Sequence, residues 1–427
     1  WTGGLIGIAG GHSTVHMALT IIGCSVTGST IKGAGSVGGV IGHAINDANT
    51  EATITGTTIT GNTIISTGSS TNKAGAVMGT VGAAETTLNA AVSGNKVTSG
   101  TNAENCIFGR FGTSKGILSI TGGSYDSVNI IPDDFPGGNS FKISDGVFTG
   151  AKPFGDPAAT VFNGLEISGG TFNQEVPNGE VPNGPCAVGY IPYDNKDGTY
   201  TVINGKTPVA ISAEYTYSDS SSAFDANPMV FSQYPTSMKC YPILADGTVD
   251  TSSDIADLRD LFLYKGTSVK ITNGFGIRII TQMNKSQKSN LISNGFSFGG
   301  KTYKLVEAGT MAMMWSEYST NGNEFDTSAR ITSATFYQSS GQDAIFDDKG
   351  SDIWCTNNIT GWRDDQLPKG VLLRPYAKFV DDNGAELYVY GGIINRSIEY
   401  VANANLSKFD PSSQEYQLLN AMVEKSH

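Results

Sequence analysis

The stretch ITGTTITG at Ile54–Gly61 decides how the first half of the chain folds. It combines an apolar residue, a polar residue, a glycine near the third place, and a second apolar residue five positions after the first. Five further copies of this pattern, some with an aromatic residue in the second apolar place, start at Ile21, Val92, Ile120, Ile143 and Ile167. A phrase that recurs in this way predicts a repeat architecture, in which equivalent positions of successive repeats stack on one another.

A second phrase recurs over the first 112 residues. Its copies are GGLIG at Gly3–Gly7, GGVIG at Gly38–Gly42, GAVMG at Gly75–Gly79 and the degenerate NCIFG at Asn105–Gly109. Each copy comes shortly before a copy of the ITG phrase. Every early repeat is therefore expected to hold two strand segments, one flanked by glycine and strongly apolar, the other alternating.

These two phrases predict a parallel β-helix, a solenoid whose repeats pair in parallel about 4.8 Å apart. Ile54 and Ile59 are five residues apart and would face opposite sides under strict alternation, so Gly56 is expected to mark a corner or bulge. The register predicts one column of Ile21, Ile54, Val92, Ile120, Ile143 and Ile167. It predicts a second column of Val26, Ile59, Val97, Tyr125, Phe148 and Phe172.

The chain as a whole is predicted to be all-β, with three parts. Residues 1–175 form the parallel β-helix. Residues 176–205 form a cap and linker that includes a hairpin arm, DGTYTV, at Asp197–Val202. Residues 206–427 carry short alternating runs and form a β-sandwich-like module. Apolar periodicity and caps place short helices in this module at Ser253–Lys265, Lys285–Asn294, Ile398–Ala404 and Ser412–Lys425.

Composition and charge exclude several classes of function. The 427 residues carry a net charge of -12 with no basic stripe, so nucleic acid is not an expected partner. No apolar run reaches about 18 residues, so direct membrane insertion is not expected. The five cysteines are scattered and are expected to be structural free thiols. The chain opens inside a motif, as a processed or truncated piece of a longer protein would.

The GGLIG and GGVIG phrases, followed by the ITG phrase, resemble the Gly-rich repeats of cell-surface proteins of gut Firmicutes. ISGGTF at Ile167–Phe172 followed by DGTYTV is similar to the segment that closes many such helices. GIRIITQM at Gly276–Met283, LLRPYAKFVDDNGAELYVYG at Leu372–Gly391 and RSIEYVA at Arg396–Ala402 resemble their downstream β-rich module. The resemblance implies a right-handed parallel β-helix of the pectate-lyase type in an extracellular, adhesin-like protein attached to the cell envelope.

Histidine is scarce, which limits the catalytic chemistry that the chain can perform. His12, His16, His43 and His427 are the four histidines, so no Ser-His-Asp triad is expected in the C-terminal half. His12 and His16 in HSTVH are not expected to form a zinc pair, because two strand residues four apart lie about 13 Å from each other. His43 takes the place of Ile8, Thr80 and Arg110 in other repeats, and this variety predicts a tolerant surface position.

Carboxylates leave two further sites to consider. Asp126, Asp133, Asp134 and Asp145 could serve a carbohydrate-active enzyme, a lyase or hydrolase acting from the β-helix groove, although Asp133 and Asp134 lie in a turn-like composition. Asp347, Asp348 and Asp352 lie in FDDKGSD and offer oxygen ligands for Ca²⁺. No other cofactor is expected.

Aromatic residues of the second half offer a surface on which sugars could stack. Trp354 and Trp362 lie in the polar stretch IWCTNNITGWRDDQ and are the expected exposed pair. The sequence therefore predicts a non-catalytic extracellular surface protein, an adhesion or structural module. Its expected partners are host or cell-wall glycans or neighbouring subunits, with self-assembly into an oligomer or filament. The alternative is the carbohydrate-active enzyme described above.

Overall fold

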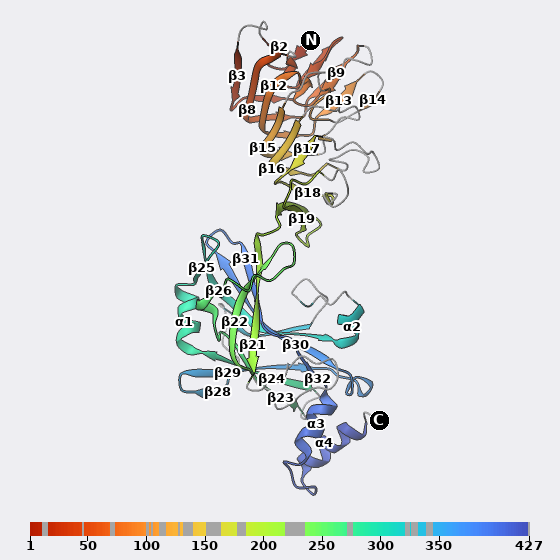
Figure 1. The fold of residues 1–427 in the computed structure, drawn as a ribbon. Coiled ribbons are helices and arrows are strands. Elements are labelled where there is room, and N and C mark those ends of the chain that lie inside the picture. Colours follow the sequence, from red (N-terminus) through yellow and green to blue (C-terminus); the bar gives the residue numbers. More distant parts are fainter. Residues whose placement is uncertain are drawn as a thin grey trace. The chain divides into compact units, whose positions relative to one another are not determined.

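A computed structural model of the chain (Figure 1) describes residues 1–10, 16–44, 47–68, 73–99, 102–103, 106–110, 117–126, 129–130, 140–150, 164–176, 185–217, 235–270, 276–320, 325, 332–338 and 345–425. The chain divides into two compact units, residues 1–207 (unit 1) and 208–427 (unit 2). Strands dominate both, and the α-helices among the described residues are short and confined to unit 2. The predicted all-β class is confirmed at this level.

Unit 1 is built almost entirely of parallel strand pairs. Its strands are β1 (Thr2–Gly3), β2 (Ile6–Ala9), β3 (Met17–Ile22), β4 (Ser25–Thr27), β5 (Thr30–Gly33), β6 (Val37–Gly38), β7 (Ile41–Ala44), β8 (Asp47–Thr60), β9 (Thr63–Ser66), β10 (Ala74–Gly75), β11 (Met78–Thr80), β12 (Ala83–Ser93), β13 (Lys96–Ser99), β14 (Asn102–Ala103), β15 (Ile117–Tyr125), β16 (Ser140–Phe148), β17 (Leu165–Ile167), β18 (Thr171–Phe172), β19 (Tyr190–Asp194) and β20 (Tyr200–Asn204). The largest sheet pairs β3, β8, β12, β15 and β16 in chain order. Three smaller sheets join β1, β6 and β10, then β2, β7 and β11, then β5, β9, β13 and β14.

The two predicted columns of side chains exist, with one repeat assigned wrongly. The first column is Ile21, Ile54, Leu88, Ile120, Ile143 and Ile167. The second is Val26, Ile59, Val92, Tyr125, Phe148 and Phe172. Every member is buried. Val92 was predicted in the first column and Val97 in the second, but Val97 pairs with Ile64 in a different sheet.

A missing bulge explains this error. Gly56 has a φ of 61° and is the extra residue at which the β8–β12 register shifts, so the bulge predicted at this glycine is confirmed. The third repeat has no such extra residue, and its two inward residues, Leu88 and Val92, are therefore only four apart. The glycine that matched the phrase, Gly94, has a φ of 61° and corresponds to Gly61 at the next turn.

The glycine-flanked phrases form the tightest part of unit 1. Gly3, Gly38 and the equivalent Gly75 pair in β1, β6 and β10. A Cβ on Gly38 would lie 1.9 Å from the carbonyl oxygen of Ile41 and 2.8 Å from the backbone nitrogen of Gly79. Glycine recurs here because backbone packs directly against backbone, as the sequence pattern indicates.

Polar and aromatic side chains also stack from one repeat to the next. The backbone N–H of Asn62 donates to Oδ1 of Asn95 (3.0 Å), and Nδ2 of Asn95 donates to the carbonyl of Ile59 (2.8 Å). Both asparagines are buried, so they satisfy turn backbone groups that water cannot reach. Phe148 lies parallel to Tyr125 (centroids 4.9 Å apart) and to Phe172 (4.8 Å).

Antiparallel strands end the largest sheet. β20 pairs with β18 through Phe172 and Tyr200, and β19 pairs with β20. The predicted hairpin arm at Asp197–Val202 is therefore present, since β20 begins within it. This hairpin covers the strand edge that β18 would otherwise expose.

The described residues of unit 2 form two sheets and four short α-helices. Its elements are β21 (Pro208–Tyr217), β22 (Pro235–Leu244), η1 (Ala256–Leu258), β23 (Leu263–Lys270), β24 (Gly276–Asn284), α1 (Lys285–Ser293), β25 (Phe296–Phe298), β26 (Lys301–Met314), α2 (Trp315–Thr320), β27 (Thr332–Gln338), β28 (Ile345–Lys349), β29 (Asp352–Thr360), η2 (Asp364–Gln366), β30 (Val371–Asp381), β31 (Glu386–Tyr390), β32 (Ile394–Arg396), α3 (Ile398–Leu406) and α4 (Gln414–Glu424). The larger sheet follows β22-β21-β31-β30-β26-β25, with β27 beside β26 and β32 beside β30; the smaller follows β23-β24-β29-β28.

The two sheets of unit 2 share their cores. One core contains Leu305 and Phe379 from the larger sheet with Met283 and Cys355 from the smaller. A second core adds residues of α3 and α4 to both sheets. A buried hydrogen bond also joins the sheets, from Oγ1 of Thr310 on β26 to Oδ1 of Asn357 on β29 (2.8 Å).

Three of the four predicted helices are confirmed as α1, α3 and α4. The helix predicted over Ser253–Lys265 is wrong, because only the short η1 forms there and β23 follows. Asp254 accepts from the backbone N–H of Cys240, and Asp260, at a φ of 56°, accepts from that of Met238. These carboxylates bind the segment to β22, and tertiary contacts override the apolar helical spacing.

Candidate binding pocket

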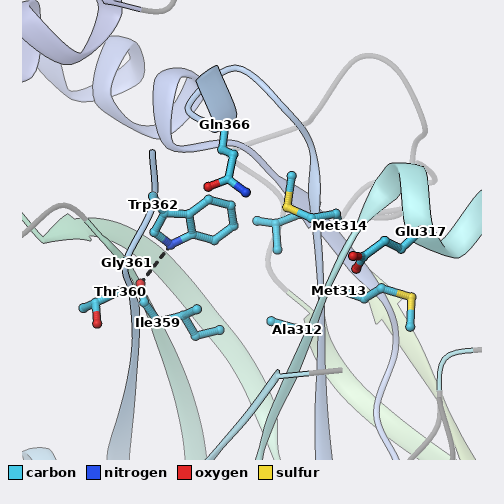
Figure 2. A pocket seen from close by; sticks show the side chains of 10 residues that line it. Ala312, Met313, Met314, Glu317, Ile359, Thr360, Gly361, Trp362 and Gln366 are labelled. Carbon is cyan, nitrogen blue, oxygen red and sulfur yellow. Dashed lines mark hydrogen bonds between the residues drawn. The ribbon is translucent and has the colours of Figure 1, made fainter. Parts of the chain in front are cut away.

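A pocket of about 440 Å³ opens where the two sheets of unit 2 end (Figure 2). Its lining residues come from the ends of β26 and β29, from α2, from η2 and from the start of β30: Ala312, Met313, Met314, Glu317, Ile359, Thr360, Gly361, Trp362, Gln366 and Val371. The antiparallel register sets Met314 opposite Val371, which brings these ends to one place. The volume is within the range of small-molecule and side-chain pockets.

The floor of the pocket is apolar and the rim is mixed. Ala312, Met313, Ile359 and Val371 are buried. The rim residues are half-buried or exposed: Met314, Glu317, Thr360, Gly361, Trp362 and Gln366. A ligand would therefore meet an indole, a thioether, an amide and a carboxylate before it reached the aliphatic floor.

Trp362 is held in place by local structure. β29 ends at Thr360, and Gly361, with a φ of 90°, turns the chain so that Trp362 borders the pocket. Its Nε1 donates to the carbonyl of Ile359 (3.0 Å), which fixes the half-buried ring. The indole thus presents a fixed apolar surface.

Two polar side chains of the rim have distinct capacities. In Figure 2 the Glu317 carboxylate reaches toward the pocket from α2, across from Trp362. Gln366 accepts from the backbone N–H of Arg363 through Oε1 (3.0 Å), which leaves its amide nitrogen as a donor. Within the described part of the chain, Glu317 is the only charged side chain that lines the pocket.

Trp354, the other predicted aromatic residue, lies elsewhere in unit 2. It is on β29, six residues before the strand ends, which corresponds to roughly 20 Å of extended chain. Its Nε1 donates to Oε1 of Gln282 (3.1 Å), and Nζ of Lys349 lies 4.7 Å from its ring centroid. The structure therefore does not bring Trp354 and Trp362 together as one platform.

The acidic residues predicted for Ca²⁺ contact protein nitrogen atoms. Asp348 pairs with Nζ of Lys285 at 2.6 Å, and this bond holds the pKa of the Asp348 carboxyl below its usual value. Asp352 accepts from the side-chain amides of Gln282 and Asn284 (both 3.1 Å). The side chain of Asp347 lies outside the described part. Within that part, no group of three or more His, Cys, Asp or Glu residues is arranged to hold a metal.

The carboxylates considered for catalysis in unit 1 are separated. Asp145 pairs with Thr121, whereas Asp126 accepts from Oγ1 of Thr149, four residues beyond Asp145. Four strand residues correspond to roughly 13 Å. Asp133 and Asp134 lie outside the described residues.

Two of the histidines are placed by the structure, while His12 and His427 fall outside the described ranges. His16 contacts Glu51 at 3.0 Å on the surface. His43 is half-buried and packs 5.2 Å from the Trp1 ring, so its assignment as a tolerant surface position is wrong. Burial, followed by the positive charges of the terminal amino group and Arg110, lowers the pKa of His43.

Comparisons with protein-family models, with curated proteins and with solved structures found no match to this chain. The resemblance to Gly-rich surface proteins therefore remains a prediction from the motifs. Each helix in the described ranges falls short of the length and apolarity that a bilayer crossing requires.

The sequence indicated Trp362 but missed the rest of the pocket. Met313, Met314 and Glu317 are more than 40 residues earlier in the chain than Trp362. They come close to it because Ala312 of β26 and Ile359 of β29 pack in the same core. The signal that was present is the apolar run MAMMW at Met311–Trp315, followed by an exposed glutamate. Such a run marks a buried strand end but does not reveal what lies across from it.

Proposed function

We propose that this chain is a non-catalytic extracellular surface protein, an adhesion or structural module with a spacer and a contact unit. In this proposal residues 1–175 form a right-handed parallel β-helix that acts as the spacer. Unit 2 is a β-sandwich-like module that makes the contact. Its partners are host or cell-wall glycans or neighbouring subunits.

The observation that carries this proposal is the in-register stacking of unit 1. Six strand positions in succession place equivalent residues in two buried columns. Strands that pair in this way form a stiff support along their stacking direction, since each repeat contacts only its neighbours. The pocket beside Trp362 gives unit 2 a concave surface on which a partner can be held.

A binding assay paired with a product assay tests this function. The full chain is applied to glycan arrays, to isolated cell walls and to acidic polysaccharides such as polygalacturonate. We expect retention on at least one surface and no release of reducing ends or unsaturated products. Product formation that is lost in Asp145→Asn would replace this proposal with the carbohydrate-active enzyme.

A further inference from the structure

We infer that the Trp362 pocket binds the side chain of a lysine residue on a protein partner. This inference rests on the proposed function, because it assumes that unit 2 makes the contact. It goes beyond that proposal by choosing a protein partner over a glycan and by naming the residue type that enters.

Charge is the first reason. Among the described residues, Glu317 is the only charged side chain of the lining, and no ion-pair partner for it lies among them. The cations near the neighbouring η2 segment are already paired: Arg363 and Lys369 with Asp365, and Lys425 with Asp364. The whole chain carries a net charge of -12, which attracts cationic partners over a longer range.

Shape and polarity are the second reason. A lysine side chain has a four-carbon apolar stem and a compact ammonium group. Met314 and Trp362 offer apolar surface for such a stem at the rim, and the Glu317 carboxylate lies across from Trp362 to accept from the ammonium (Figure 2). The amide nitrogen of Gln366 can donate to a backbone carbonyl of the same partner residue. The indole, the thioether, the carboxylate and the amide of the rim thus each have a counterpart on a lysine within a peptide.

The test uses three short peptides and the full chain. The first, acetyl-Gly-Lys-Gly-amide, is compared with its norleucine analogue, which keeps the stem without the charge, and with the Nε-acetyl-lysine analogue. Binding is measured by calorimetry and by saturation-transfer NMR at low salt. We expect the lysine peptide to bind about tenfold more tightly than either analogue, as a hydrogen bond to a charged group predicts.

Matched variants locate the effect. Glu317→Gln should weaken the lysine peptide about tenfold without changing the affinity for norleucine. Glu415→Gln is the control, because Glu415 is an equally exposed glutamate in the first turn of another helix of unit 2. Trp362→Ala should weaken all three peptides, and its folding is checked by comparing its unfolding transition with that of the wild type.

Several outcomes would overturn the inference. Equal binding of the lysine and norleucine peptides would remove the role of Glu317. An equal loss in Glu317→Gln and Glu415→Gln would indicate overall charge rather than the pocket. Methyl glycosides that bind in a Trp362-dependent way, while the lysine peptide does not, would identify a sugar site. That last result contradicts the lysine inference but leaves the adhesive function standing, whereas catalytic turnover in the product assay contradicts the adhesive function itself.

Discussion

Unit 1 and unit 2 are both rich in strands, but they obtain their order in different ways. In unit 1 equivalent residues of successive repeats lie on one another, so Ile54 contacts two residues of the same kind, Ile21 and Leu88. In unit 2 each strand has its own partners, and the two sheets are joined by contacts that occur once, such as Thr310 with Asn357. The stability of unit 1 therefore depends on the same side-chain contact recurring from repeat to repeat. The stability of unit 2 depends on individual contacts that each occur once.

The largest expected effect comes from a substitution that removes one ring from the stacked aromatic side chains of unit 1. Phe148→Ala deletes a buried ring that stacks on both Tyr125 and Phe172, and it should cost unit 1 about 3–5 kcal/mol of unfolding free energy. Hydrogen exchange measured by mass spectrometry should show faster exchange in unit 1 and no change in unit 2. Val147→Ala, at the exposed neighbouring position, is the control. Equally faster hydrogen exchange in both units would contradict the view that the two units are stabilised separately.

The second prediction concerns the close backbone approach in the glycine phrases. Gly38→Ala places a methyl group against the backbone of Ile41 and Gly79, and it should destabilise unit 1 by about 3 kcal/mol. Gly28→Ala is the matched control, since its φ is 58° but no atom lies within 4 Å of the added Cβ. Backbone strain alone should cost about 1 kcal/mol there. Urea denaturation of both variants measures the difference, and equal losses would contradict the packing argument.

The third prediction tests a particular pair in unit 2. Asn357→Ala leaves the hydroxyl of Thr310 buried without its acceptor, and it should cost unit 2 about 2 kcal/mol. The double variant Thr310→Val, Asn357→Ala removes both polar groups and should recover part of this loss. The free energies of unfolding of Thr310→Val, Asn357→Ala and the double variant complete a double-mutant cycle. Additive losses would show that the hydrogen bond does not couple the sheets.

The smallest expected effect is a difference between the two units in how their stability depends on pH. Because burial lowers the pKa of His43 in the folded state, the unfolded chain takes up this proton first as the pH falls below the ordinary value of 6.5. Unit 1 should therefore lose stability from about pH 6.5 downward until the pH passes the folded pKa, with no further loss from this group below it.

A carboxyl of unit 2 should respond only at lower pH. The backbone N–H of Ala385 and the ammonium of Lys301 lower the pKa of Asp381 from its ordinary value of 3.8. Its stabilisation is present above that value and is lost as the pH falls through the folded pKa. At pH 5 the protection of amides against hydrogen exchange, corrected for the intrinsic exchange rate at that pH, should fall in unit 1 alone, and His43→Gln should remove that response. A wild-type pH profile in the His43→Gln variant would show that another group titrates.

The same contrast explains how much could be predicted from the sequence. Positions that recur in the repeat phrase can be recognised from the sequence alone. Five of the six members of each column in unit 1, between Ile21 and Phe172, were therefore predicted correctly. The two exceptions, Val92 in the first column and Val97 in the second, have one cause: the bulge residue is absent from one repeat, and a turn glycine occupies the matching place in the phrase. In unit 2 local patterns found three helices and Trp362. They could not find Glu317 as a neighbour of Trp362, because that proximity depends on the packing of β26 against β29, which are far apart in the sequence.

The in-register stacking of unit 1 also bears on how such a chain changes over generations. A repeat pairs through the same kinds of residues on both sides, as Ile54 does with Ile21 and Leu88. A duplicated or deleted repeat therefore meets a surface to which it is already complementary. Unequal recombination can lengthen or shorten unit 1 in steps of about 4.8 Å without any new side-chain contact having to arise. The described residues of unit 2 include no interchangeable layer, so the length of unit 1 can change without any change in the structure of unit 2.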